Sequence, residues 1–360
     1  MTEALRFLFI PVSGPGGAGE YFRSLAVARA VERCWPGSSI RFLVSRDAAY
    51  SQGGPYPAVL LDRSPTFEST AVIRAIEDHR PHVVVFDSAG RVEQQQAARR
   101  VGARVVFVSS RPSIRRKGFS LRRMRATDQH WIAQPRFLGG ELTAFEQWKR
   151  KLAPRLEVLL LEVIHEPVDE AGTRALQQQF GVLPGGYVLA CPGGGGVFGH
   201  GPDAAQVFFD AASRVRAESG LPVVAVLGSR FVVPASLPQG VHVLSGVPNG
   251  QLMGMLRDAK AGMVNGGSLL MQAIAQHTPC VAAPIADDQP PRIDKTAARG
   301  YVRAAKLDAT ELAESAVSLL REDASREGLR ARLMQLDLRN GIDVAMDAIG
   351  RLLPPDSRLR

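Results

Sequence analysis

Short apolar runs alternate with segments of helical spacing along the whole chain, and this alternation most constrains the fold. In the first half, apolar runs at 6–12, 40–45, 82–88 and 104–110 are separated by stretches whose apolar residues recur at helical spacing. The same alternation restarts with the run at 187–193. Strands and helices that alternate in this way predict parallel sheets with helices on both faces.

The length predicts more than one such sheet. The chain has 360 residues, and single hydrophobic cores stop growing at about 250–300 residues. We therefore expect an α/β protein of two doubly wound, Rossmann-like domains that face each other across a cleft. The expected domains are residues 1–165 and 166–340, and a final helix in 341–360 is expected to pack back on the first domain.

Composition excludes several classes of protein. The longest apolar runs, such as 158–161 and 281–285, are far shorter than the roughly 20 residues that span a bilayer. The N-terminal apolar run leads directly into a glycine turn, which favours a first strand over a signal peptide. Cys34, Cys191 and Cys280 share no metal-binding spacing, and scattered cysteines disfavour disulfides and zinc. We therefore expect a cytoplasmic protein without a metal.

The formal charge is +9 and the calculated pI is near 9.9, with the excess concentrated in one basic segment. That segment contains Arg111, Arg115, Arg116, Lys117, Arg122, Arg123 and Arg125. Such a cluster indicates a polyanionic partner, whether phosphate, nucleic acid or an anionic membrane face. A solvated basic loop without a partner is the alternative. Nucleic acid is disfavoured, because the segment has a single aromatic residue, Phe119, and no known binding motif.

A glycine-rich loop follows the first strand and precedes a helix. Its glycines include Gly16, Gly17 and Gly19, which do not have dinucleotide-binding spacing. Glycine lets a ligand approach the backbone closely, and a helix N-terminus favours negative charge. Glu20 is the only ionisable residue of this loop. It is either an acid that stabilises the helix start or a general base, and spacing alone does not separate the two.

A second loop opens the other half with four consecutive glycines, Gly193, Gly194, Gly195 and Gly196. Strand packing does not require four glycines, and their conformational entropy opposes folding. A backbone cradle for a diphosphate explains them. His200 follows as a candidate phosphate donor, although a lone histidine is more often incidental.

A third candidate site lies in 264–289, where a strand, a helix and a second strand follow one another. Gly266, Gly267 and Ser268 begin the helix, so its first N–H groups are expected to bind an anion, and Ser268 can also cap it. The second strand ends on polar groups that could bind sugar hydroxyls: Asp287, Asp288 and Gln289. A solvated turn is the alternative for these acids.

These three sites, in this order, resemble those of the GT-B glycosyltransferases. The likeness is greatest to the branch that contains the lipid-linked N-acetylglucosaminyltransferase of peptidoglycan synthesis. In that family a histidine of the first loop precedes a Leu-Ala-Val-Ala helix. The same letters stand here at 25–28, which puts Glu20 at the histidine position, while Pro15 and Ala18 replace two loop glycines. The resemblance therefore implies that Glu20 deprotonates the acceptor hydroxyl.

The stretch 264–289 resembles the donor segment of the same family. Anchored on Pro279, Gln272 stands where a ribose-binding glutamate is expected, and Leu269 replaces a threonine. Arg292 replaces an asparagine, whereas Gly300 keeps its spacing. The resemblance implies that Gln272, Asp287, Asp288 and Gln289 bind the nucleotide and the sugar.

The implied activity is an inverting, metal-independent transfer of a sugar from a nucleotide-diphosphate sugar, UDP-linked, to a hydroxyl acceptor, as in cell-envelope or natural-product glycosylation. No cofactor beyond this co-substrate is expected. The basic segment would bind a phosphate-bearing or lipid-linked acceptor, with peripheral contact at the inner membrane surface. Two alternatives stay open: a nucleotide-sugar hydrolase or 2-epimerase on the same fold, and a non-catalytic partner subunit.

Overall fold

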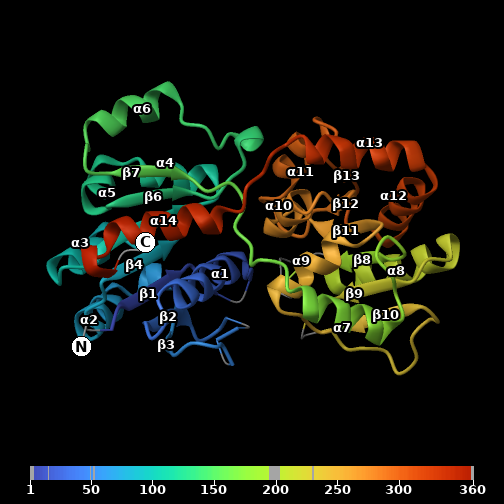
Figure 1. Ribbon diagram of the computed structural model, residues 1–360, viewed down its shortest axis with the longest axis horizontal. Helices are drawn as coiled ribbons and strands as arrows, with labels where there is room; N and C mark the ends of the chain where they lie inside the picture. The colour runs from blue at the N-terminus through green and yellow to red at the C-terminus, as the bar shows by residue number, and fades with distance from the viewer. Residues whose placement is uncertain are drawn as a thin grey trace. The chain divides into compact units, whose positions relative to one another are not determined.

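The structure is a computed structural model that describes residues 4–14, 16–48, 50–51, 53–193, 203–228 and 231–357. The chain divides into two compact units (Figure 1). Unit 1 contains Met1–Ile164 and Arg339–Arg360, and unit 2 contains His165–Leu338. Each unit has one parallel sheet with its own helices, so the predicted class of two doubly wound α/β domains is confirmed. The sequence places the boundaries after residues 165 and 340.

The sheet of unit 1 has the strand order β3-β2-β1-β4-β5-β6-β7. The chain starts in the middle of the sheet and moves outward in both directions, which is the doubly wound arrangement. Its strands are β1 (Arg6–Pro11), β2 (Ser39–Ser45), β3 (Ala58–Leu61), β4 (Val83–Asp87), β5 (Arg104–Ser109), β6 (Gln129–Ile132) and β7 (Glu157–Leu160).

Helices cover both faces of this sheet. The side chains of the central strand, β1, point alternately to one face and the other, and they are buried on both. Phe7 and Phe9 pack with the helices α1 and α14, whereas Leu8 and Ile10 pack with α2 and α3. All four side chains are buried, so β1 has hydrophobic contacts on both faces, as central parallel strands do. The helices of unit 1 are α1 (Gly19–Cys34), α2 (Ser69–His79), α3 (Val92–Arg100), α4 (Pro112–Gly118), α5 (Leu121–Ala126), α6 (Ala144–Lys151) and α14 (Gly341–Leu352).

The final helix, α14, belongs to unit 1 although 174 residues of unit 2 precede it in the chain (His165–Leu338). Ile342, Ala345 and Ile349 are buried in the same cluster as Trp35 of unit 1. The Gln129 side chain also donates a 2.8 Å hydrogen bond to the backbone carbonyl of Ala348 in α14. Core packing and this buried hydrogen bond therefore hold α14 on unit 1.

Unit 2 repeats the doubly wound pattern with the strand order β10-β9-β8-β11-β12-β13. Its strands are β8 (Val188–Cys191), β9 (Val223–Val226), β10 (Val241–Leu244), β11 (Ala261–Asn265), β12 (Cys280–Ala283) and β13 (Arg303–Ala304). Its helices are α7 (Glu170–Phe180), α8 (Ala204–Ser219), α9 (Asn249–Arg257), α10 (Ser268–Ala275), α11 (Pro290–Ala297), α12 (Ala309–Arg321) and α13 (Asp323–Met334).

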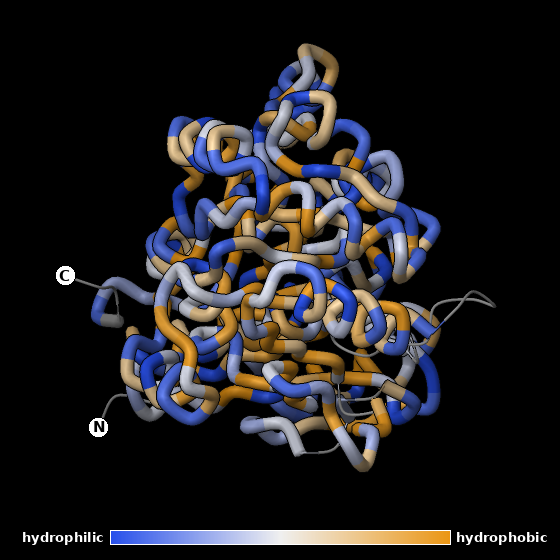
Figure 2. The backbone as a smooth tube through the Cα atoms, turned by 90° about the vertical axis from the view of Figure 1, so that its right-hand side faces the viewer, coloured by the Kyte–Doolittle hydropathy of each residue, from blue (hydrophilic) through white to orange (hydrophobic). Residues whose placement is uncertain are grey.

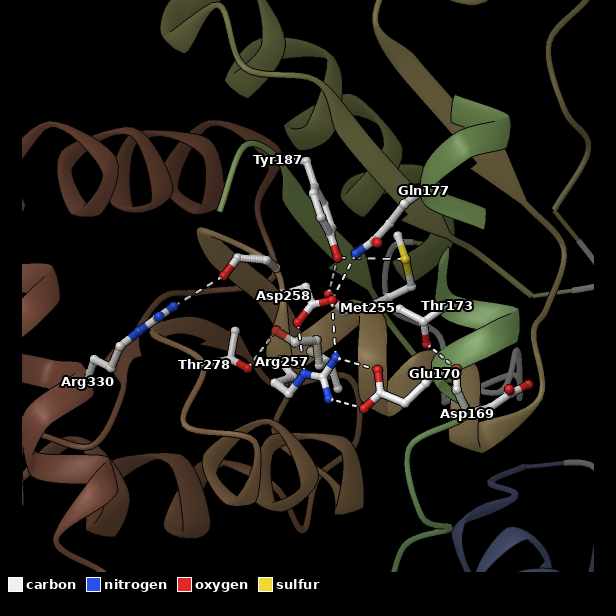
Figure 3. A network of polar contacts seen from close by, with 12 residues as sticks. Asp169, Glu170, Thr173, Gln177, Tyr187, Met255, Arg257, Asp258, Thr278 and Arg330 are labelled. Carbon is white, nitrogen blue, oxygen red and sulfur yellow. Dashed lines mark hydrogen bonds and ion pairs between the residues drawn. The ribbon is translucent and has the colours of Figure 1, made fainter. Parts of the chain in front are cut away.

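A polar network fixes the C-terminal end of α9 in unit 2 (Figure 3). The Arg257 guanidinium lies between Glu170 of α7, at 2.6 Å, and Asp258, at 2.8 Å. The Tyr187 hydroxyl donates to the Met255 carbonyl at 2.6 Å, and the Thr278 hydroxyl donates to the carbonyl of Leu256 at 2.8 Å. Side chains thus satisfy helix-end carbonyls that lack partners within the helix.

Hydrophobic segments run mainly through the strands, with hydrophilic segments along the outer helices and loops (Figure 2). Among the helices in the described residues, none combines the length and hydrophobicity that a membrane span requires. Several elements differ from the sequence-based expectation. The strands β3, β7 and β13 and the helices α11 and α13 were not predicted, and the basic segment, expected as a loop, contains α4 and α5.

Candidate active site

In unit 2, three candidate segments meet at one edge of the sheet. Strand β11 lies between β8 and β12, and these strands pair in parallel, with Val264 opposite Cys191 and Asn265 opposite Ala283. The residues that follow the three strands therefore emerge at the same edge. We call Gly193, Asn265–Ser268 and Gln289 the loop cluster of unit 2.

Asn265 joins two of these segments through its side-chain amide. Its Nδ2 donates to the Pro192 carbonyl at 2.6 Å, and its Oδ1 accepts from the backbone N–H of Gly267 at 2.6 Å. Asn265 is buried, so both amide atoms are used inside the protein. Asn265 is a site residue that was not predicted from the sequence. An asparagine between a buried strand and two glycines is the signal that could have identified it.

The glycines of this cluster allow close approach of the chain to itself. Gly193 has φ = +100°, and a Cβ there would lie 2.3 Å from Asn265 Nδ2. A Cβ on Gly267 would lie 2.7 Å from Asn265 Oδ1. Neither position can carry a side chain without a shift of Asn265. The predicted residues Gly194, Gly195, Gly196 and His200 lie outside the described residues.

Gln289 also braces the cluster. Its Oε1 accepts from the backbone N–H of Gly266 at 3.1 Å and from that of Ile285 at 2.9 Å. The side chain is buried, so its amide oxygen serves the loop rather than facing solvent. Arg292 supports the same loop, because its Nη1 donates to the Gly266 carbonyl at 2.7 Å.

Helix α10 begins beside these contacts with Gly267 as its N-cap residue, and no side chain of the described residues caps it. The Ser268 side chain is exposed at the helix start instead of capping it, and Gln272 is half-buried one turn later. The first N–H groups of a helix lack intrahelical partners and carry partial positive charge. This helix start is therefore suited to bind an anion.

Asp287 and Asp288 are exposed near the same edge. Asp288 Oδ2 lies 3.9 Å from Arg292 Nη2, a weak ion pair at this distance and exposure. Within the described residues, no group of three or more His, Cys, Asp or Glu side chains could hold a metal ion. Burial raises the pKa of the Cys191 and Cys280 thiols to about 12, so both remain protonated core residues.

In unit 1, Glu20 lies in the first turn of α1, after the first glycine loop. Gly17 of this loop has φ = +71°, and Gly19 is the first residue of the helix, while Gly16 precedes both. Glu20 Oε1 accepts a 3.0 Å hydrogen bond from Arg111 Nη2. The structure therefore joins the candidate base to the first residue of the basic segment.

Arg23 and Asp87 form a buried pair near Glu20, which the sequence analysis did not identify. Arg23 follows Glu20 by three residues on α1, and Asp87 ends β4. Arg23 Nε lies 2.8 Å and Nη2 2.5 Å from the two carboxylate oxygens of Asp87. Burial raises the pKa of the Asp87 carboxyl, and Arg23 opposes that rise. This two-point contact fixes α1 against the end of β4.

Tyrosines cover the same helix start. Tyr21 and Tyr50 stack with ring centroids 4.0 Å apart, and Phe22 packs edge-on against Tyr21 at 5.5 Å. Burial raises the pKa of Tyr50, and the negative charge of Glu20 contributes to the shift. A cluster of aromatic rings thus packs at the helix residues that follow Glu20 in unit 1.

The basic segment is only partly available to a ligand. Arg116, Lys117 and Arg122 are exposed, but Arg115 and Arg123 are buried. Arg115 bonds the Glu146 carboxylate, at 2.8 and 2.6 Å, and two backbone carbonyls. The Arg123 guanidinium lies 4.5 Å from the centre of the Phe107 ring, and its Nη2 donates to the Gly90 carbonyl at 3.0 Å. These two arginines hold the segment on the domain. They were expected to bind an anionic ligand, but their burial and their contacts within the protein do not leave them available for one.

The chain has the fold of the GT-B glycosyltransferases, a class of protein with two Rossmann-like domains. The sequence predicts this fold. No family model and no curated protein sequence matches the chain.

Particular solved structures are similar along almost the full length. The spinosyn forosaminyltransferase SpnP is 15% identical, with a TM-score of 0.66 over 97% of this chain and 100% of that one. The kitacinnamycin glycosyltransferase is 17% identical, with a TM-score of 0.63 over 98% and 100%. A putative UDP-N-acetylglucosamine 2-epimerase from Listeria monocytogenes is 11% identical, with a TM-score of 0.59 over 97% and 96%.

Proposed function

We propose that the protein is a glycosyltransferase that moves a sugar from a nucleotide-diphosphate sugar, UDP-linked, to a hydroxyl acceptor with inversion. The observation that carries the proposal is the start of α10. No side chain in the described part of the chain caps it, and it adjoins loops that Asn265 and Gln289 brace. On a GT-B fold, this helix start is suited to the diphosphate of a donor.

The chemical roles follow from the groups present. Glu20 accepts the proton of the acceptor hydroxyl, whose oxygen bonds to the anomeric carbon as the bond to the diphosphate breaks. Arg111 orients the Glu20 carboxylate through their 3.0 Å contact. N–H groups at the start of α10 stabilise the charge of the departing diphosphate. Gln272, Asp287 and Asp288 contact the nucleotide and the sugar, and the transfer needs no metal.

The acceptor belongs to unit 1 in this proposal. The exposed cations Arg116, Lys117 and Arg122 support a phosphate-bearing or lipid-linked acceptor and peripheral contact with the cytoplasmic face of a membrane. This part of the proposal rests on the resemblance of the sequence to the peptidoglycan branch of GT-B enzymes.

The test is the release of nucleoside diphosphate from a panel of nucleotide sugars, with and without hydroxyl acceptors. Release that depends on an acceptor, with a glycosylated product, supports transfer. Release of free sugar at the same rate without any acceptor indicates a hydrolase, and a changed sugar on an intact donor indicates a 2-epimerase. If no donor is turned over, the proposal is wrong and the alternative of a non-catalytic partner subunit is favoured.

A further inference from the structure

Helix α6 of unit 1 exposes large apolar side chains. Phe145 is 61% exposed, Trp148 53% and Leu152, just after the helix, 42%. The Phe145 and Trp148 rings stack with centroids 5.7 Å apart, and no residue of the helix is buried. Neither aromatic ring therefore serves the core, although exposing them to water is unfavourable.

The last turn of α6 carries only positive charges. Lys149, Arg150 and Lys151 form the last turn of α6, and Lys149 Nζ lies 4.6 Å from the centre of the Phe145 ring. The acid of this helix, Glu146, faces inward, where it bonds Arg115 and the Thr143 backbone N–H. The outward side of α6 thus combines aromatic rings with cations.

Contacts on its inner side fix this helix. Thr143 and Glu146 form a capping box, in which the Thr143 hydroxyl accepts from the Glu146 backbone N–H. The Arg115–Glu146 ion pair, at 2.6 Å, connects α6 to α4. A helix held in this way keeps Phe145 and Trp148 together on its outer side.

We propose that α6 is a docking helix for the surface of an anionic phospholipid bilayer. Tryptophan and phenylalanine enter the boundary between headgroups and acyl chains, while lysine and arginine remain among anionic headgroups. Charge complementarity favours this occupant over a second copy of the chain, because a symmetric contact would place the same cations opposite one another.

The inference rests on the membrane contact of the proposed function but not on sugar transfer. It also assigns that contact to a different element from the basic segment. Vesicle binding is measured without a sugar nucleotide, so failure of one proposal is distinguishable from failure of the other.

The chain itself supplies a reporter. It has three tryptophans, of which Trp35 is 8% and Trp131 0% exposed, against 53% for Trp148. Brominated acyl chains quench only indoles that enter the bilayer. With vesicles of phosphatidylglycerol and phosphatidylcholine, we expect the protein to co-sediment and Trp148 to be quenched. With phosphatidylcholine alone, and at high salt, binding should weaken because the charges are no longer attracted.

Matched variants locate the contact. Phe145→Ala should lower the partition coefficient roughly 5–10-fold, since about 1–1.4 kcal/mol of apolar burial is lost. Phe67→Ala is the control, because Phe67 is 57% exposed and also lies under a cation, Arg63, at 4.9 Å. It should bind as the wild type does. Trp148→Phe should keep co-sedimentation and lose the quenching.

The inference would be overturned by no binding to anionic vesicles, by binding without quenching of tryptophan, or by equal losses for Phe145→Ala and Phe67→Ala. If instead Arg116→Gln and Lys117→Gln abolish binding while Phe145→Ala leaves it unchanged, the basic segment docks and α6 does not.

Discussion

Asn265 Nδ2 donates a hydrogen bond to the Pro192 carbonyl at 2.6 Å and so joins the ends of two neighbouring strands in unit 2. The other amide atom, Oδ1, holds the backbone N–H of Gly267. One buried side chain therefore sets the position of the glycine after β8 relative to the start of α10. If a diphosphate binds there, its affinity depends on a residue that need not touch it.

The first prediction concerns Asn265→Ala. Removing both hydrogen bonds leaves buried backbone groups without partners, so the free energy of unfolding should fall by about 1–3 kcal/mol. Affinity for a nucleoside diphosphate should fall at least about tenfold because the loop loses its brace. Urea denaturation and calorimetric titration measure the two effects.

Asn249→Ala is the matched control, since Asn249 Oδ1 accepts the Glu166 backbone N–H at 2.9 Å in the same unit. That variant should lose stability without losing nucleotide affinity. Unchanged nucleotide binding by Asn265→Ala would contradict the assigned role of the loop.

The second prediction tests Glu20. Glu20→Gln keeps the size of the side chain but cannot take up the proton of the acceptor hydroxyl, so kcat should fall about 10²–10⁴-fold. Donor affinity should stay unchanged, because the residue lies in unit 1. Glu32→Gln, on the same helix and bonded to Tyr56, should keep its activity. Equal kcat values for wild type and Glu20→Gln would remove Glu20 from the mechanism.

The central strands of both sheets were predictable from the sequence, whereas most of the edge strands were not. Central strands such as β1 and β4 are continuous apolar runs, because both of their faces are buried. The edge strand β3 has three exposed residues of four, and β7 has none fully buried. Their sequences therefore lack the contrast that distinguishes a buried strand from a loop.

The candidate site was predictable in its glycine loops but not in its side-chain contacts. The Glu20–Arg111 contact spans 91 positions, and that of Asn265 with Pro192 spans 73. Nothing local selects Arg111 over the other arginines of the segment. The burial of Arg115 was not predictable either, because its ion-pair partner, Glu146, lies on α6, far from it in the sequence.

The third prediction separates structural from exposed arginines. Arg115→Met leaves the Glu146 carboxylate without its guanidinium partner, and breaking a buried pair in this way costs about 3–5 kcal/mol. Arg116→Met removes an exposed cation and should change the free energy of unfolding by less than about 0.5 kcal/mol. Urea midpoints of the two variants give the comparison. Similar stabilities would mean that the Arg115 contacts contribute nothing to the fold.

The fourth prediction is a pH dependence from His130. Burial lowers the pKa of this histidine from 6.5 to about 3, and its Nε2 lies 2.9 Å from the Ser109 hydroxyl. Between these pH values the unfolded chain binds a proton that the folded chain does not. Stability contributed by neutral His130 is therefore complete above pH 6.5 and is lost as the pH falls toward 3, by at most about 1.4 kcal/mol per unit.

His130→Gln should accordingly show a flatter dependence of unfolding free energy on pH from 6 to 4. Carboxylates titrate equally in both proteins, so the difference between the two curves isolates the histidine. Parallel curves would show that His130 is not held neutral in the folded state.

Calorimetric titration with nucleoside diphosphates and their monophosphates tests the proposed diphosphate site at the start of α10. We expect at least one diphosphate to bind, uridine diphosphate first among them. We also expect it to bind at least about tenfold more tightly than the matching monophosphate, because the second phosphate adds contacts to the helix start. Binding of no diphosphate, or equal affinity for the two forms, would contradict a diphosphate site at this helix start.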